Sequence, residues 1–291
     1  TALSAQVRTE LLLEKGWKFT REDNPQSIQA SYDDSRWQSV VVPHDWAIYG
    51  PFSAQNDKQN VAITQDGQKE AMEHAGRTGG LPFVGVGWYR NTLDIPQYKS
   101  GKKAFILFDG AMSHAQVYIN GEKVGYWPYG YNSFWFDISS YLKEGEKNTI
   151  AVRLENLPES SRWYPGAGLY RNVHLIVTED AYIPVWGTYI TTPQVNEKFA
   201  KVKVETKVVL PNDYKLHTTL SAPDGKDILE KEESLSSIIY NDSVLVQEFI
   251  VENPDLWSTD TPALYTAKSS LYKGGEQLKD EYKTRFGIRS I

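Results

Sequence analysis

Residues 108–136, FDGAMSHAQVYINGEKVGYWPYGYNSFWF, decide the fold class that the sequence predicts. Apolar and polar side chains alternate over residues 115–119, which is the period-two pattern of a strand with one buried face. The pair Asn120-Gly121 follows, and it favours a type I′ turn because both central residues of that turn need a positive φ. Residues 123–126 are then the expected return strand of a hairpin. No helix fits this stretch, so we expect a protein built from sheets.

Further short strands are expected on both sides of this hairpin. Up to residue 177 the apolar runs are short and are separated by turn residues about every 8–12 positions, a spacing typical of a β-sandwich or jelly roll. The expected strands outside the hairpin are residues 17–19, 40–42, 87–95, 104–108, 148–154 and 172–177.

A domain boundary is expected near residues 181–187, where the strand pattern restarts. Hairpin turns are predicted at Asp224-Gly225 and Gly274-Gly275, and roughly six or seven strands in about 110 residues are typical of an immunoglobulin-like sandwich. We therefore predict an all-β chain, with a jelly-roll β-sandwich over residues 1–181 and an immunoglobulin-like β-sandwich over residues 182–291.

The composition excludes several classes of function. There is no cysteine, which rules out disulfides, thiolate zinc sites and a cysteine nucleophile. No apolar run reaches the roughly 18 residues of a membrane-spanning helix. The 31 basic and 37 acidic residues give a net charge of −6, which argues against a nucleic-acid backbone or an anionic membrane as a partner. The five histidines have no metal-ligand spacing, so no metal site is expected in this chain.

Two loops carry the side chains best suited to a ligand. His44-Asp45-Trp46 follows a predicted buried strand and combines a titratable ring, a carboxylate and an aromatic ring. Residues 161–166, SRWYPG, have a similar content. A purely structural interpretation stays open for both loops, in which Asp45 caps backbone amides and the rings pack down. Trp127, Tyr129 and Tyr131 suit a sugar-stacking platform or, as we favour, packing of the hairpin.

Catalytic signatures are absent from the sequence. No G-x-S-x-G nucleophile elbow is present, and no two carboxylates can be paired as a glycosidase site from sequence alone.

The chain nevertheless resembles the N-terminal part of glycoside hydrolase family 2 enzymes, the β-galactosidase and β-glucuronidase family. The resemblance covers nearly the whole chain, because its motifs occur in the family's order from one end to the other. They are DDSRWQSVVVPHDWAIYGPF (33–52), GVGWYRNTLDIP (85–96), FDGAMSHAQVYINGEKVG (108–125), GYNSFWFDISSYL (130–142), NTIAVRLEN (148–156), SSRWYPGAGLYRNVHL (160–175), PDLWSTDTPALY (254–265) and TRFGIRSI (284–291).

The resemblance implies a galactose-binding-like jelly roll, then an immunoglobulin-like domain, then a (β/α)₈ barrel that carries both catalytic glutamates. The chain stops where that barrel is expected, so no catalytic residue is expected here. The resemblance also implies that Asp45 reaches the barrel's pocket and bonds to sugar hydroxyls. The candidate substrate-binding residues are Asp45, His44, Trp46, Arg21, Arg162 and Trp163.

The implied partners are a β-galactoside substrate and the enzyme's own C-terminal catalytic barrel. No cofactor is expected in this chain, although family members often hold a monovalent or magnesium ion in the full enzyme. Assembly into a homo-oligomer is left open. An extracytoplasmic location, periplasmic or secreted, is favoured over a cytoplasmic one, although no secretory signal is visible at residue 1.

Three functions follow from these expectations. The first is the non-catalytic part of a retaining exo-glycosidase, a β-galactosidase above all. The alternatives are a stand-alone carbohydrate-binding module and a structural or subunit-contact scaffold. One segment departs from the family: residues 53–82 lack the compact form usual after Gly-Pro-Phe and are expected to be a long structureless loop.

Overall fold

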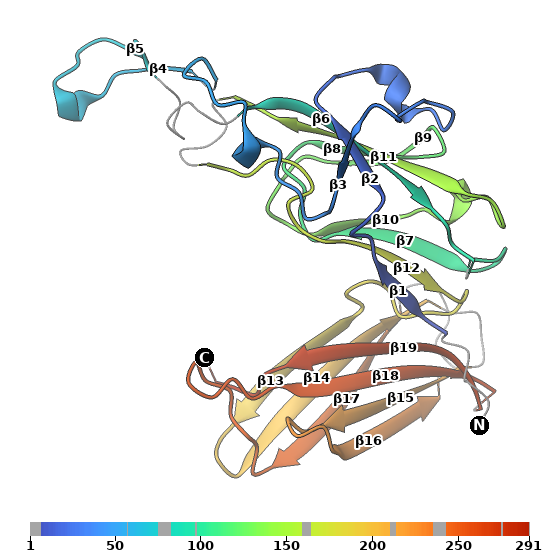
Figure 1. Ribbon diagram of the computed structural model, residues 1–291. Coiled ribbons are helices and arrows are strands. Elements are labelled where there is room, and N and C mark those ends of the chain that lie inside the picture. The colour runs from blue at the N-terminus through green and yellow to red at the C-terminus, as the bar shows by residue number, and fades with distance from the viewer. Residues whose placement is uncertain are drawn as a thin grey trace. The chain divides into compact units, whose positions relative to one another are not determined.

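The computed structural model describes residues 7–56, 58–74, 83–96, 98–158, 164–209, 214–234, 243–274 and 276–290. Over these ranges the chain forms strands β1 to β19 and the short 3-10 helices η1 to η4, and it contains no α-helix (Figure 1). The all-β prediction is therefore confirmed. No described helix is long and apolar enough to cross a membrane.

The chain divides into two compact units. One, the N-terminal sandwich, is Glu10–Val177. The other, the immunoglobulin-like unit, combines Thr178–Ile291 with the segment Thr1–Thr9. The chain therefore passes between the units twice, once between Thr9 and Glu10 and once between Val177 and Thr178.

The N-terminal sandwich has two sheets, which Figure 1 shows as stacked layers. One sheet has the order β1-β12-β7-β10, and the other has the order β3-β2-β6-β11-β8-β9. Their strands are β1 (Thr9–Leu12), β2 (Trp17–Thr20), β3 (Gln38–Val40), β6 (Gly85–Leu93), β7 (Lys103–Phe108), β8 (Ala115–Ile119), β9 (Glu122–Trp127), β10 (Phe134–Asp137), β11 (Asn148–Asn156) and β12 (Val173–Thr178).

The β8–β9 hairpin has the predicted geometry. Ala115, Val117 and Ile119 are fully buried in the core between the sheets, as the alternation requires. The two-residue turn joins Ile119 to Glu122, and both of its residues have a positive φ, 52° at Asn120 and 91° at Gly121. The type I′ turn read from the sequence is therefore present.

The outer face of the six-stranded sheet is covered by the segment between β2 and β3, which includes η1 (Pro25–Ile28). Arg90 is 2% exposed, and its Nε lies 2.8 Å from Asp34 Oδ2 while Nη1 donates to the carbonyl of Gln29. Trp37 and Trp88 form a small second core under the same segment. This ion pair and this core hold a long stretch without strands in place.

The structure of residues 58–74 differs from the structureless loop that the sequence predicts for residues 53–82. Instead of a structureless loop they form a hairpin of β4 (Gln59–Val61) and β5 (Met72–His74), with η3 (Thr64–Asp66) between the strands. Gly67 takes a left-handed φ of 78° that lets the chain reverse, and Lys58 and Glu73 pair at 2.6 Å. Strands this short and polar show no alternation of apolar and polar residues, so the sequence pattern does not predict them. Residues 57 and 75–82 lie outside the described residues.

The immunoglobulin-like unit is a second sandwich, with sheets β13-β14-β17 and β16-β15-β18-β19 around an apolar core. This arrangement confirms the predicted fold. Its strands are β13 (Thr188–Val195), β14 (Phe199–Val208), β15 (Tyr214–Ser221), β16 (Asp227–Ser234), β17 (Ser243–Glu252), β18 (Tyr265–Lys273) and β19 (Gln277–Phe286). We did not predict β16, because this edge strand, DILEKEES, is mostly charged and exposed.

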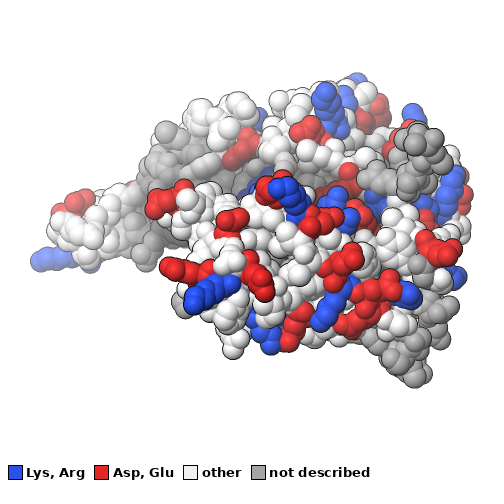
Figure 2. Space-filling model, turned by 90° about the horizontal axis from the view of Figure 1, so that it is seen from below, with Lys and Arg blue, Asp and Glu red and all other residues white. Residues whose placement is uncertain are grey.

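Charges on the molecule are mixed in sign. Figure 2 shows acidic and basic side chains intermingled on the face that it draws. Ion pairs also form along the strands of the immunoglobulin-like unit, such as Lys201 with Glu248 at 2.8 Å and Lys215 with Glu232 at 2.6 Å. The described part of this face therefore gives no broad basic field for a polyanion.

Candidate functional site

Trp46 anchors the loop that follows β3. Its ring stacks on Phe19, with 5.6 Å between ring centroids and 19° between planes, and only 2% of the residue is exposed. Its Nε1 donates to the Phe83 carbonyl at 3.2 Å. The ring lies so close to Gly87 that a Cβ there would be 2.4 Å from it. Trp46 therefore fixes the loop by core packing.

Asp45, next to this anchor, is half-buried and makes contacts in two directions. Its Oδ1 accepts a hydrogen bond from the Ala47 N–H at 3.0 Å, a local turn bond that leads into the 3-10 helix η2 (Ala47–Tyr49). Its two carboxylate oxygens each lie 2.5 Å from the Tyr164 hydroxyl, which donates to them. Burial, and secondarily Asp45, raises the pKa of Tyr164 well above its usual value, so the hydroxyl keeps its proton.

Tyr164 belongs to a second loop, residues 164–172, between β11 and β12. The N–H and carbonyl of Gly168 both bond to the backbone of Met112 at 2.9 Å. The φ of Gly168 is +99°, and a Cβ there would lie 2.3 Å from the Tyr89 hydroxyl, so only glycine fits. The neighbouring Leu169 carbonyl accepts the His44 N–H at 2.7 Å. The two loops are therefore joined through their backbones as well as through Tyr164 and Asp45.

His44 lines the same junction. Its Nδ1 lies 2.7 Å from the hydroxyl of the buried Tyr89, and its ring is parallel to the exposed ring of Tyr49, with 6.3 Å between centroids. Burial lowers the pKa of His44, and the charge of Asp45 opposes that shift. The imidazole is thus neutral near pH 7. In the described part of the chain Nε2 has no hydrogen-bond partner, so it is available to a ligand.

Arg21 lies beside the far end of the first loop. Its Nη1 donates to the Gly50 carbonyl at 2.8 Å, and its guanidinium stands 5.2 Å from the centre of the Phe83 ring. The structure therefore brings Arg21 together with the His44–Trp46 loop. The two remaining candidates, Arg162 and Trp163, lie outside the described residues.

Tyr164 was missed by the sequence reasoning. The motif SRWYPG was singled out, but within it only Arg162 and Trp163 were named. The hydroxyl lies 119 positions from Asp45 along the chain, and no local pattern reveals such a pairing. Tyr89 and Gly168 escaped notice for the same reason.

The aromatic residues after the hairpin mostly pack, as we favoured. Trp127 is half-buried and stacks on Phe134, with 5.6 Å between centroids. Tyr129 and Tyr131 meet edge to face at 5.6 Å, and Tyr129 stays 53% exposed. Among the residues that the structure describes, no group of three or more histidine and acidic side chains is placed to hold a metal ion.

Fold and site together define a class: two β-sandwich units, the first of which carries a polar and aromatic site on two joined loops. Family profiles then match almost the whole chain. The profile described as "Glycosyl hydrolases family 2, sugar binding domain" covers residues 12–179, and "Glycosyl hydrolases family 2" covers residues 182–289. The chain therefore belongs to family 2 of the glycosyl hydrolases.

Known relatives carry two activities in their names. Beta-galactosidase BoGH2A of Bacteroides ovatus is 37% identical over 94% of this chain and 31% of its own length. A putative beta-glucuronidase of Formosa agariphila is 34% identical over 98% of this chain and 25% of its own. A family 2 member from Bacteroides cellulosilyticus has a solved structure with a TM-score of 0.84 and 29% identity, over 96% of this chain and 35% of that one. The chain thus spans about a third or less of each.

Proposed function

We propose that the chain is the N-terminal, non-catalytic part of a glycosidase that hydrolyses terminal β-galactosides with retention. Residues 1–181 form its sugar-binding domain and residues 182–291 its immunoglobulin-like domain. The observation that carries the proposal is the half-exposed Asp45 carboxylate, held by Tyr164 at 2.5 Å beside a neutral His44. The 37% identity to a beta-galactosidase supports the choice of sugar.

In this proposal the two joined loops form one wall of the sugar pocket. The Asp45 carboxylate accepts hydrogen bonds from two vicinal sugar hydroxyls, and a hydrogen bond to a charged group contributes about 1.5–3 kcal/mol. His44 Nε2 serves a further hydroxyl and Arg21 lies at the rim, and Arg162 and Trp163 remain further candidates for contact with the sugar. Trp46 acts as a positioning residue, because its ring packs in the core. Holding the sugar in one orientation raises the rate of attack at its anomeric carbon.

The bond-breaking chemistry belongs to the proposed C-terminal barrel, which is the chain's main partner. A retaining glycosidase needs two carboxyl groups about 5–5.5 Å apart, one as nucleophile and one as acid and base. Both are expected in the barrel, together with any monovalent or magnesium ion. Residues 1–291 alone are therefore expected to be inactive.

A β-glucuronidase is the second candidate, because relatives with that name match the chain at comparable length. The test is to express the gene to its natural stop codon and measure kcat/KM for p-nitrophenyl β-galactoside and β-glucuronide, with residues 1–291 as the control. Preference for the galactoside supports the proposal. Preference for the glucuronide replaces it with the second candidate. Turnover of neither substrate, or equal turnover by residues 1–291, overturns the proposal.

A further inference from the structure

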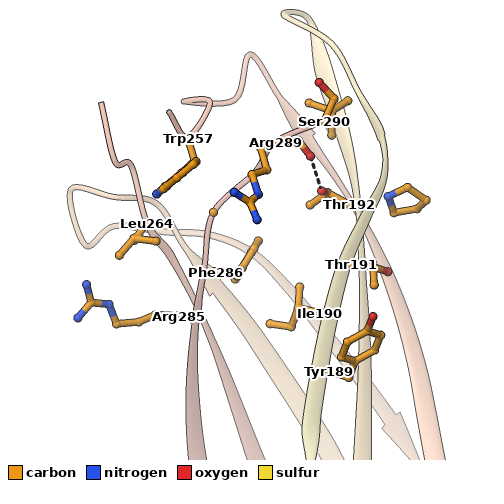
Figure 3. A pocket seen from close by; sticks show the side chains of 13 residues that line it. Tyr189, Ile190, Thr191, Thr192, Trp257, Leu264, Arg285, Phe286, Arg289 and Ser290 are labelled. Atoms are coloured by element: carbon orange, nitrogen blue, oxygen red, sulfur yellow. Dashed lines mark hydrogen bonds between the residues drawn. The ribbon is translucent and has the colours of Figure 1, made fainter. Parts of the chain in front are cut away.

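A groove of about 710 Å³ opens in the immunoglobulin-like unit (Figure 3). It lies between β13, an edge strand of the three-stranded sheet, and the end of β19, an edge strand of the four-stranded sheet. Edge strands expose unpaired backbone groups and are usually covered in native proteins. The volume is within the range of occupied ligand pockets, about 300–1,000 Å³.

The groove's C-terminal wall is anchored rather than loose. The backbone N–H of Trp257 donates to the backbone carbonyl of Ile288 at 2.8 Å, and the Ile288 side chain is fully buried. Thr192 Oγ1 donates to the Arg289 carbonyl at 2.9 Å, the bond drawn in Figure 3. Gly287 lies under Trp257, where a Cβ would come within 2.7 Å of the indole. The wall is therefore a preformed surface up to Arg289.

The groove combines positive charge with apolar surface. Arg285 and Arg289 line it, and among the described residues no acidic side chain does. Within the described part of the chain neither guanidinium has an ion-pair partner, although Arg289 stacks over Trp257 at 4.8 Å. By contrast Lys283, on the same strand as Arg285, pairs with Glu281 at 3.3 Å. Two uncompensated arginines stand out in a chain of net charge −6.

The apolar part of the lining is half-buried. Ile190, Leu264 and Phe286 contribute to it, and each keeps part of its surface open. A complementary occupant therefore offers carboxylates to the arginines and apolar side chains between them.

We infer that this groove is the docking seat for the polypeptide that follows Ile291, through a face of that polypeptide carrying carboxylates opposite Arg285 and Arg289. The inference rests on the proposed function. Relatives are about three times longer than the chain, which covers 31% of the Bacteroides ovatus enzyme. Residues 287–290 form the groove's wall, so whatever follows them emerges beside it. The charge of the groove then selects an acidic face.

Hydrogen exchange of the full-length protein against residues 1–291 tests the inference. We expect amides of residues 189–195 and 285–290 to exchange about tenfold or more slowly in the full-length protein. The double variant Arg285→Glu/Arg289→Glu should lose that protection, and Lys283→Glu, the matched control on the same strand, should keep it. In residues 1–291 alone the double variant should exchange nearly like the wild type, because neither guanidinium has a described ion pair and only the stacking of Arg289 on Trp257 is lost.

Equal exchange in the two wild-type proteins, or protection that survives the double variant, overturns the inference. So does protection of the same peptides in residues 1–291 by D-glucuronate, which would make the groove a small-ligand site. The proposed function is judged separately. An active full-length galactosidase with an unprotected groove refutes docking alone, and an inactive protein with a protected groove refutes the function alone.

Discussion

Arg8 and Asp280, 272 positions apart in the sequence, form a bidentate ion pair in the immunoglobulin-like unit. Arg8 Nε and Nη2 lie 2.9 and 2.7 Å from the two carboxylate oxygens. The Asp280 side chain is fully buried and also accepts the Ile183 N–H at 2.7 Å. Arg8, just before β1, is thus paired with a buried carboxylate of the immunoglobulin-like unit.

Removing the arginine should destabilise that unit. Arg8→Ala leaves the Asp280 charge buried without its partner, a change that typically costs about 3–5 kcal/mol. The measurement is urea denaturation, following the immunoglobulin-like unit by hydrogen exchange. Lys215→Ala is the control, because it removes an exposed pair with Glu232 and should have a much smaller effect. Equal losses of unfolding free energy in the two variants would mean that the buried ion pair stabilises the unit no more than the exposed one.

Asp45 should matter for kinetics beyond its local bond to Ala47. In the full-length enzyme Asp45→Ala should lower kcat/KM by about 10- to 150-fold for each transition-state hydrogen bond lost. Loss of the bond to Ala47 should cost about 1 kcal/mol of stability as well. Asp45→Asn separates the two effects, because the asparagine Oδ1 can still accept the Ala47 N–H but carries no charge. Normal kinetics in both variants, with a lowered Tm only for alanine, would leave Asp45 as a loop clamp.

Gly168→Ala should disrupt the junction of the two site loops. The new Cβ would lie 2.3 Å from Tyr89 Oη and 2.7 Å from the His44 carbonyl, in addition to the strain of a φ of +99°. Gly101→Ala is the matched control in the same unit, since its φ is +93° and nothing lies within 4 Å of the added Cβ. The control should lose about 1–2 kcal/mol from backbone strain alone. We expect a larger loss of unfolding free energy for Gly168→Ala, and equal losses would refute the steric reason.

His174 should make the stability of the N-terminal sandwich depend on pH. Its ring nitrogens lie 3.2 Å from Glu10 and 3.1 Å from Asp109, and the hydrogen bond with Glu10, then that with Asp109, raises its pKa against burial. Because the folded pKa exceeds the unfolded value of about 6.5, the extra stability is complete below that pH. It is lost as the pH rises through the folded pKa.

The check is the unfolding free energy of wild type and His174→Gln from pH 5.5 to 8.5. The lowered pKa of His44 acts in the opposite direction, so the difference between the two proteins is the quantity to follow. That difference should shrink as the pH rises. A difference that stays constant would show that protonation of His174 does not stabilise the fold.

Local patterns in the sequence predicted local structure well. The Asn120-Gly121 turn depends on two residues whose backbone preferences hold in any context, so its hairpin was readable. Strand β16 was not, because a charged edge strand buries too little to leave an alternation. The loop with His44 and Asp45 was located by its residue types. Its partner Tyr164 was not, because contacts between distant residues are set by packing of the whole sandwich.

The double passage of the chain between its units sets an order of events during synthesis. Residues 10–177 are complete as a unit about a hundred residues before Asp280 is made. Translation proceeds at about 5–20 residues per second, so the N-terminal sandwich has roughly 5–20 s on the ribosome in which to fold. During that time Arg8 has no Asp280 carboxylate to pair with. Arg8 is therefore made well before Asp280, and its ion pair is among the last contacts of the immunoglobulin-like unit to form.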